Sequence, residues 1–180
     1  MKELSLNVLD IVENSTKAKA SLVEISITEN NSELKIEITD DGIGMTREIL
    51  DSVTNPFCTT RKTRRVGLGI PLFKLAAEQT GGEFKIISKH IDEYPNAHGT
   101  VVSAAFSKEH IDFTPLGDII STIVTLIQGH PTVDFLFTHT TNDKSVRLDT
   151  RELREVLGDV PLDSFEILIW IRDYLTEQYN

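Results

Sequence analysis

The chain has 180 residues, 39% of them hydrophobic and 26% charged, which is the composition of an ordinary globular protein. Its formal net charge is −10, and residues 107–180 carry 6 basic against 13 acidic side chains, so the chain offers no basic stripe to a nucleic acid. The single cysteine, Cys58, the lack of any membrane-length apolar run and the lack of a signal-peptide pattern predict a cytoplasmic protein without disulfides or a membrane partner.

A helix over residues 4–18 is predicted by apolar residues that recur at helical intervals. On its remaining surface, Asp10 and Asn14 lie about 40° apart around the helix axis, with Lys17 one turn later. Glu13 is turned about 100° away from Asn14. These residues could form a solvated face, but an asparagine in mid-helix is mildly unfavourable and asks for a functional reason. The apolar face consists of Leu4, Val8, Ile11 and Val12.

Two strands are predicted over 22–28 and 34–39, because apolar and polar residues alternate in each of them. The second strand ends at a carboxylate, Asp40, which is followed by Gly42 and Gly44. Glycines at such positions allow a positive φ angle and the close approach of a flat ligand. An acidic turn would contain the same residues, so the features that follow decide between a turn and a binding site.

A polar and basic stretch over 55–65 has no periodicity and is predicted to be a mobile loop. Gly67 and Gly69 close this loop and open a helix. A helix N-terminus beside a basic loop favours phosphate, because its free N–H groups and its dipole both attract an anion. The other elements predicted in this part are a short helix capped by Thr46 and ending near Val53, the end of the helix after Gly69 at about Gln79, and strands over 83–89 and 100–106.

The order of these features resembles the GHKL ATPase domain, the family of DNA gyrase, the ninety-kilodalton heat-shock chaperone, sensor histidine kinases and mismatch-repair ATPases. The resemblance covers residues 3–106. It implies an ATP-binding domain over residues 1–106 with a two-layer α/β sandwich of the Bergerat type and a mixed, mostly antiparallel sheet. The whole chain is also similar to small stand-alone histidine-kinase-like ATP-binding proteins of bacteria. Neither a P-loop nor a dinucleotide fingerprint is present.

The resemblance also implies roles for individual residues. Asp40 would accept the adenine amino group, and Asp41 stands beside it where many relatives carry asparagine. Thr100 would close the far side of the ring through a water molecule, and Asn14 would hold Mg²⁺. The ring would lie against Gly42, Gly44 and Met45, and the phosphates would face Lys17, Thr59, Thr60, Arg61, Lys62, Gly67, Leu68 and Gly69.

Asp10 bears on the class of reaction, because relatives that hydrolyse ATP or phosphorylate serine carry glutamate at this position. Sensor histidine kinases usually carry asparagine or histidine there. A water or serine hydroxyl needs a base to take its proton, whereas an imidazole attacks with a free lone pair. We therefore expect Asp10 to be the base for phosphoryl transfer in trans to a protein hydroxyl or to water, although aspartate is one methylene shorter than glutamate. The alternatives are an ATP-gated binding switch and a histidine kinase catalytic subunit with a separate phosphoacceptor.

Residues 107–180 lie outside the motif match and are predicted to form a small α+β appendage. Its acidic charge and apolar helices suit docking of a protein partner with a basic rim around an apolar groove, and a homodimer is left open. The predicted elements are a helix from Thr114 and Pro115 to Gly129, strands over 133–137 and 146–148, and two helices capped by Asp149 and Asp163, the last with Trp170 in its apolar face.

The segment from His110 to Leu116 resembles the phosphoacceptor stretch of sensor kinases. Ile111 replaces the acidic neighbour of the histidine, and a proline-started helix explains the segment without a function. Because the helix that carries Asn14 begins at the start of the chain, we expect no phosphoacceptor hairpin before it and expect any kinase activity to act on a separate protein. The remaining histidines show no metal-ligand spacing.

Overall fold

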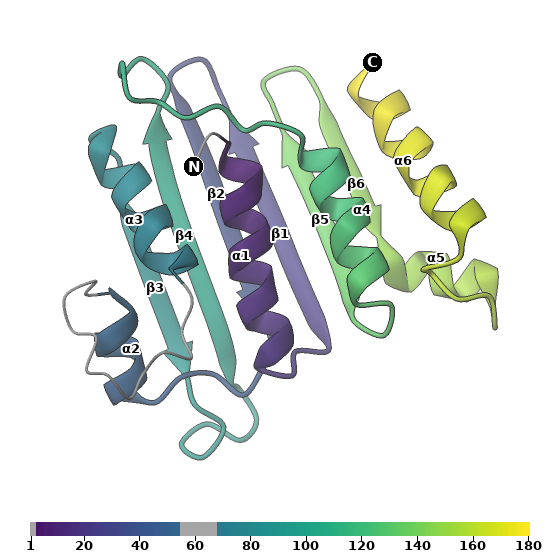
Figure 1. The fold of residues 1–180 in the computed structure, drawn as a ribbon, viewed down its shortest axis with the longest axis horizontal. Coiled ribbons are helices and arrows are strands. Elements are labelled where there is room, and N and C mark those ends of the chain that lie inside the picture. The colour runs from purple at the N-terminus through teal and green to yellow at the C-terminus, as the bar shows by residue number, and fades with distance from the viewer. Residues whose placement is uncertain (1–2, 55–67) are drawn as a thin grey trace.

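The computed structural model describes residues 3–54 and 68–180 (Figure 1). The elements up to β4 lie within one residue of their predicted bounds. In chain order the elements are α1 (Leu4–Lys17), β1 (Leu22–Glu29), β2 (Glu33–Asp40), α2 (Arg47–Thr54), α3 (Gly69–Gln79), β3 (Phe84–Lys89), β4 (Gly99–Ser107), α4 (Ile119–Gly129), β5 (Asp134–Thr140), β6 (Ser145–Asp149), α5 (Thr150–Leu157) and α6 (Phe165–Tyr179).

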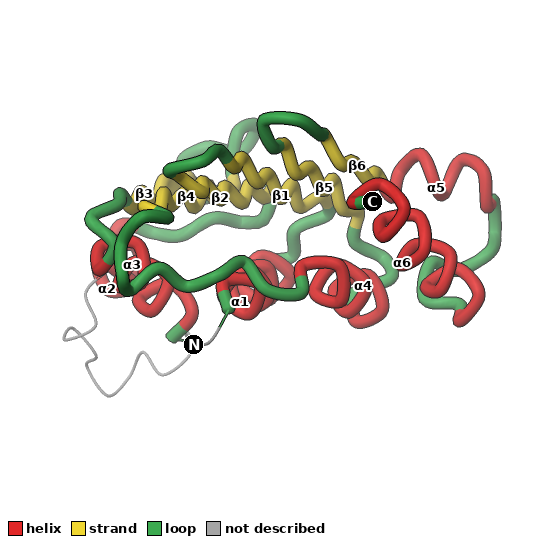
Figure 2. Tube along the Cα trace, turned by 90° about the horizontal axis from the view of Figure 1, so that it is seen from above, coloured by secondary structure: helices red, strands yellow, loops and turns green. Residues whose placement is uncertain are grey.

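The strands form one six-stranded sheet in the order β3-β4-β2-β1-β5-β6. β1 and β5 run parallel, whereas the other neighbouring pairs among the described strands are antiparallel. Figure 2 shows α1, α3 and α4 side by side along one face of this sheet. The predicted two-layer α/β sandwich with a mixed, mostly antiparallel sheet is therefore confirmed.

The hydrophobic core lies between the sheet and these helices, because each strand alternates inward and outward residues. On β1, Val23, Ile25 and Ile27 are fully buried, and they pack in the same core as Val8 and Val12 of α1. The same alternation on β2 continues to its last residue and places the carboxylate of Asp40 on the buried face. The strand pattern thus brings an acidic side chain to the edge of the core.

Residues 107–180 contribute two strands to the same sheet. β5 lies parallel to β1, with Leu22 opposite Asp134, and β6 follows as the outer strand. Side chains of α4, such as Ile123 and Ile127, belong to the same core as those of α1. The alternation of residues predicted both strands, but it did not predict that β5 would pair with β1. The division of the chain at residue 106 stays a prediction.

The first helix of this region begins later than predicted. Thr114 and Pro115 were expected to start it, but α4 begins at Ile119, and the side chain of Asp118 caps it by accepting the N–H of Ser121 at 2.9 Å. The carbonyls of Pro115 and Leu116 instead accept the N–H groups of Leu4 and Ser5 at 2.9 and 2.8 Å. These carbonyls satisfy free donors at the N-terminus of α1, so the stretch around Pro115 caps one helix and does not start another.

The last two predicted helices are both present, but the predicted cap is correct only for the first of them. Asp149 caps α5 as predicted, by accepting the N–H of Arg151 at 3.0 Å. α6 begins after Ser164, one residue later than the predicted cap Asp163, and no side chain caps it. The buried face of α6 consists of Leu168, Ile171 and Leu175. Trp170 lies outside this face, is 47% exposed and stacks on Tyr174. None of the helices in the described part of the chain is both long and apolar enough to cross a membrane.

Candidate functional site

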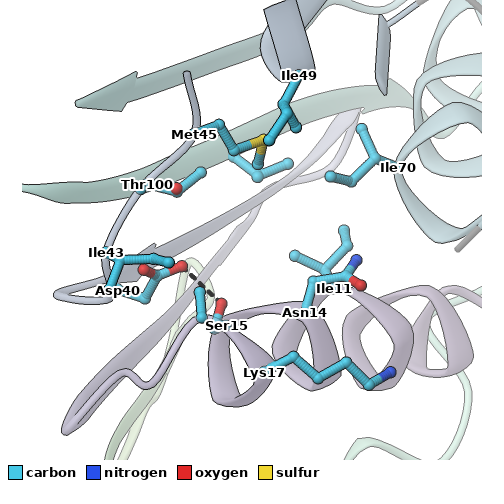
Figure 3. Close-up of a pocket in the computed structure, with 13 residues that line it drawn as sticks. Ile11, Asn14, Ser15, Lys17, Asp40, Ile43, Met45, Ile49, Ile70 and Thr100 are labelled. Carbon is cyan, nitrogen blue, oxygen red and sulfur yellow. Dashed lines mark hydrogen bonds between the residues drawn. The ribbon is translucent and has the colours of Figure 1, made fainter. Parts of the chain in front are cut away.

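A cavity of about 350 Å³ opens between α1, the loop that follows β2, α2, α3 and β4 (Figure 3). Its polar lining comes from Asn14, Ser15 and Lys17 of α1, and from Asp40 and Thr100 at the ends of β2 and β4. The rest of the wall is mostly apolar and includes Ile11, Ile43, Met45, Ile49, Ile70 and Val102. A cavity with a few convergent polar groups in an apolar wall is the usual form of a small-molecule site.

Asp40 is the buried carboxylate of this cavity. Its Oδ2 accepts the hydroxyl of Ser15 at 2.6 Å (Figure 3), and its Oδ1 accepts the N–H of Gly42 at 2.9 Å. Burial raises the pKa of the Asp40 carboxyl, although these hydrogen bonds act in the opposite direction. Each carboxylate oxygen can accept a second hydrogen bond, so Asp40 keeps acceptor capacity for a ligand that carries an N–H donor.

Ser15 was missed by the sequence analysis. It follows Val8 and Ile11 at helical intervals and therefore lies on the apolar face of α1, where it is 4% exposed. A serine among buried apolar residues needs a hydrogen-bond partner, and this was the available signal. The partner could not be identified from the sequence, because Asp40 belongs to another element.

The loop after Asp40 is held against other parts of the backbone. Gly44 has a φ angle of +71°, and a Cβ there would lie 2.0 Å from the carbonyl oxygen of Lys89. A Cβ on Gly42 would lie 2.8 Å from the carbonyl oxygen of Ala18. The positive φ expected after Asp40 is therefore present at Gly44, and both glycines are needed for close contacts inside the protein.

The far side of the cavity is closed by a small network of hydroxyl groups. The hydroxyl oxygens of Ser88 and Thr100 lie 2.8 Å apart, and the N–H of Met45 donates to the hydroxyl of Ser88 at 2.8 Å. Thr100 is 6% exposed and sits opposite Asp40 in the register of β2 and β4. The structure therefore brings Asp40, Met45 and Thr100 together at one cavity.

Asn14 faces this cavity with an amide that is incompletely satisfied. Its Nδ2 is buried and has no hydrogen-bond partner among the described residues. No three described histidine, cysteine, aspartate or glutamate residues are grouped to hold a metal ion. Mg²⁺ in nucleotide sites typically takes only one or two protein ligands and completes its shell with phosphate and water. An amide group facing the cavity fits such an ion, because either amide atom can be turned toward a ligand.

Asp10 is exposed and lies one turn before Asn14 on α1. The N-terminus of α3 packs against it: a Cβ on Gly69 would lie 2.7 Å from the Cβ of Asp10. Glu13 is turned away, as the helix geometry predicted, and its Oε1 lies 2.7 Å from Nε2 of His130 beside α4. Asp10 thus lies against the start of α3, the helix that was predicted to bind phosphate, but neither Asp10 nor Gly69 lines the cavity itself.

Asp41, the neighbour of the cavity carboxylate, has a structural role. It accepts the N–H groups of Ser21 and Leu22 at 2.7 and 2.9 Å and also the Ser21 hydroxyl. Although partial burial opposes it, these hydrogen bonds lower the pKa of the Asp41 carboxyl. Asp41 therefore fixes the start of β1 and does not line the cavity.

Several predicted phosphate-facing residues are not covered by the structure. Lys17 lines the cavity and is exposed, Leu68 is exposed directly before α3, and Gly69 is the buried first residue of α3. The predicted loop over 55–65 lies outside the described residues, and with it the candidates Thr59, Thr60, Arg61 and Lys62, as do Cys58 and Gly67.

The chain resembles known proteins in its sequence. The profile of the family described as "Histidine kinase-, DNA gyrase B-, and HSP90-like ATPase" matches residues 2–110. Sporulation kinase C of Bacillus subtilis (strain 168) is 34% identical over 83 residues, which cover 45% of this chain and 19% of that protein. Sensor protein KdpD of Clostridium acetobutylicum is 29% identical over 89 residues, which cover 46% of this chain and 10% of that protein. This chain thus matches only a small part of each of these relatives.

The fold also resembles solved structures. The N-terminal domain of a DNA repair protein superposes with a TM-score of 0.53 at 16% sequence identity, and the match covers 88% of this chain and 58% of that one. A likeness at this level of identity concerns the fold alone. Its coverage is larger than that of the family profile, so the shared fold extends into residues 107–180.

Proposed function

The chain belongs to the family of histidine kinase-, DNA gyrase B- and HSP90-like ATPases, and we propose that it binds ATP with Mg²⁺ and transfers the γ-phosphoryl group in trans to a protein hydroxyl or to water. The observation that carries this proposal is the carboxylate of Asp40, which is 8% exposed, in a mostly apolar cavity. A flat, weakly polar ring with one exocyclic amino donor is the ligand that such a cavity favours.

Adenine fits this description. Its amino group would donate to the remaining acceptor capacity of Asp40, and its faces would pack on apolar side chains such as Ile43 and Met45. Thr100, on the neighbouring strand, would offer its hydroxyl to a ring nitrogen directly or through water. Guanine presents a carbonyl oxygen in place of the amino group, so Asp40 would repel it.

The phosphates would lie toward α1 and the start of α3. Asn14 would hold Mg²⁺, which when bound neutralises phosphate charge and orients the γ-phosphoryl group. Lys17 would add a positive charge at the rim, and the free N–H groups at the first turn of α3, beginning at Gly69, would donate hydrogen bonds to phosphate oxygens. The predicted contacts from Thr59, Thr60, Arg61 and Lys62 remain part of the proposal.

Asp10 would act as the base. It lies one turn from Asn14 on α1 and next to Gly69 at the start of α3, so it flanks the proposed position of the phosphates. It would take the proton of the attacking hydroxyl as that oxygen bonds to the γ-phosphorus and as the bond to the bridging oxygen of ADP breaks. Because Asp10 is exposed, a hydroxyl group of a separate protein could reach it from solvent, as transfer in trans requires.

Two further functions are kept as candidates. The family description names histidine kinases, and one matched relative is named as a sporulation kinase, which favours a catalytic subunit that phosphorylates histidine on a separate protein. An ATP-gated switch would use the same cavity, and any hydrolysis of ATP would be incidental to it. The carboxylate at position 10 separates them, because a histidine acceptor or a switch needs no base there.

The experiment combines binding and turnover. Calorimetric titration of the wild type with ATP and Mg²⁺ should show binding, and its absence would contradict the proposal. Asp10→Asn should lower turnover by about 10²–10⁴-fold with ATP affinity kept. Glu13→Gln is the matched control, since it removes a carboxylate from the same helix at a position that faces His130. Equal turnover in wild type and Asp10→Asn would favour the switch, and transfer to a histidine by Asp10→Asn would favour the histidine kinase subunit.

We also propose a protein partner for residues 107–180. Their charge, from 6 basic and 13 acidic side chains, suits a partner with a basic rim. A second copy of this chain would bring the same acidic charge, so a homodimer is the less favoured alternative. Light scattering of the purified protein measures which oligomer forms.

A further inference from the structure

The connection between β3 and β4, residues 90–98, is hydrogen-bonded to the loop that follows Asp40. Nδ1 of His98 lies 2.7 Å from the carbonyl oxygen of Gly42, and the N–H of Ile91 donates to the carbonyl oxygen of Ile43 at 2.9 Å. These contacts join segments more than 40 residues apart in the sequence. Two successive carbonyl groups of the loop are therefore held from outside the loop.

The proton on His98 follows from its partner. A carbonyl oxygen only accepts hydrogen bonds, so Nδ1 of His98 must carry the hydrogen at 2.7 Å from Gly42. In the neutral ring this contact selects the Nδ1–H tautomer. His98 therefore donates a hydrogen bond to the loop, and a side chain with only an acceptor at this place could not replace it.

The peptide between Gly42 and Ile43 is fixed at both ends. Its carbonyl oxygen accepts from His98, and its N–H, that of Ile43, donates to the carbonyl oxygen of Ala18 at 2.9 Å. The preceding N–H, that of Gly42, donates to Oδ1 of Asp40 at 2.9 Å. A rotation of the chain at Gly42 would thus disturb one of the donors that orient the cavity carboxylate, the others being Ser15 and the backbone of Thr100.

The connection also approaches the backbone beside Asp40 closely. Gly99, directly after His98, has a φ angle of +136°, and a Cβ there would lie 2.1 Å from the carbonyl oxygen of Asp40. His98 itself does not line the cavity. Its effect on a ligand would therefore pass through Gly42 and Asp40.

We infer that His98 is a positioning residue of the adenine subsite, which holds Gly42 so that Asp40 faces the cavity. The inference rests on the proposed binding of ATP. The hydrogen on Nδ1 of His98, and not the bulk of the ring, holds Gly42 in place.

Two replacements that are nearly isosteric with each other test the role of the donor. In His98→Asn the side-chain amide places an N–H donor at the same number of bonds from the backbone as Nδ1, whereas His98→Asp places an acceptor there. His98→Asp should weaken ATP binding roughly tenfold, because one hydrogen bond is lost and two acceptors face each other. His98→Asn should bind within about threefold of the wild type.

Calorimetric titration with ATP gives the affinities, and thermal unfolding without ligand shows that each variant is folded. If His98→Asp does not fold, His98→Ala replaces it in the comparison with His98→Asn. Equal affinities in all variants would overturn the inference and leave the proposed function intact. Loss of affinity in His98→Asn as large as in His98→Asp would also overturn it, since the donor would then not be the cause. Lack of ATP binding by the wild type would instead refute the proposed function, and the inference with it.

Discussion

The hydroxyl of Ser15 donates to Oδ2 of Asp40 over 2.6 Å and so connects the first helix to the end of the second strand. Both residues are buried, at 4% and 8% exposure. The backbone of Gly42 and of Thr100 also donates to this carboxylate, and the Ser15 hydroxyl adds a side-chain donor that contributes both to the fold and to the cavity. It links the helix that carries Asn14 to the carboxylate that is proposed to select adenine.

Ser15→Ala should weaken both stability and ligand binding. Loss of the hydroxyl leaves Oδ2 of Asp40 without its side-chain donor, so the free energy of unfolding should fall by about 1–3 kcal/mol. The pKa of Asp40 should rise further, since a hydrogen bond that lowers it is removed. Urea unfolding measures the first effect, and calorimetry with ATP should show a several-fold weaker affinity. Ser26→Ala, at an exposed position of β1, should change neither quantity.

Asp40→Asn should separate stability from binding. Burial raises the pKa of Asp40, so in the wild type the native state holds its proton more tightly than the unfolded state does. The free energy of unfolding therefore falls as pH rises from the ordinary carboxyl value of 3.8 through the raised value, and it stays lower above that window. The neutral asparagine lacks this cost, and its amide can still pair with Ser15 and Gly42.

The asparagine variant should thus be at least as stable as the wild type at neutral pH, while ATP affinity falls at least tenfold through loss of a charge-assisted hydrogen bond. Urea unfolding at several pH values and calorimetric titration measure the two effects. Unchanged ATP affinity would remove the assignment of Asp40 to adenine. A large loss of stability would mean that burial of the Asp40 carboxylate does not lower the free energy of unfolding of the wild type.

The sequence predicted those parts of the site that lie on one continuous element. Asp10 and Asn14 share α1, so helical periodicity alone gives their relative orientation and turns Glu13 away from them. The end of β2 at Asp40 follows in the same way from alternation in a single strand.

Contacts between elements could not be predicted in this way. The bond from Ser15 to Asp40 spans 25 residues and depends on how α1 packs on the sheet. The Thr114-Pro115 pair is a strong local signal for a helix start, but tertiary hydrogen bonds to the N-terminus of α1 prevail. No local pattern indicates that β5 lies beside β1, because strand alternation describes which face is buried and not which strand is the neighbour.

Gly44→Ala should destabilise the protein by about 3 kcal/mol or more. The alanine Cβ would lie 2.0 Å from the carbonyl oxygen of Lys89, and its φ angle of +71° is unfavourable for any residue with a side chain. Gly81→Ala is the matched control, since Gly81 has a φ angle of +73° and no atom within 4 Å of the added Cβ. The control should cost only about 1 kcal/mol, for the backbone conformation. Similar losses in urea unfolding of both variants would show that the contact with Lys89 relaxes without cost.

His139 should make the stability depend on pH near neutrality. It lies on β5, where its Nδ1 is 2.8 Å from the hydroxyl of Tyr179, and its Nε2 is buried 3.3 Å from Oε2 of Glu29 without hydrogen-bond geometry. Burial lowers the pKa of His139, and Lys108 acts in the same direction, while Glu29 opposes them. The unfolded chain therefore takes up the proton first, at the ordinary value of 6.5. Above pH 6.5 the free energy of unfolding should be at its highest as far as His139 is concerned. It should fall as the pH drops from 6.5 toward the lowered pKa of His139 in the folded protein.

His139→Asn tests this dependence, because its side-chain oxygen can accept the Tyr179 hydroxyl but does not titrate. The smaller side chain should make the variant less stable than the wild type at pH 8, by about 1–2 kcal/mol for the lost packing. This difference should narrow as pH falls below 6.5, since only the wild type loses stability through protonation of the unfolded state at this residue. Urea unfolding at pH 8, 7, 6 and 5 measures both curves, and His110→Asn controls for removing one histidine from the chain. A constant difference between wild type and His139→Asn over this range would show that the burial of His139 does not couple its protonation to folding.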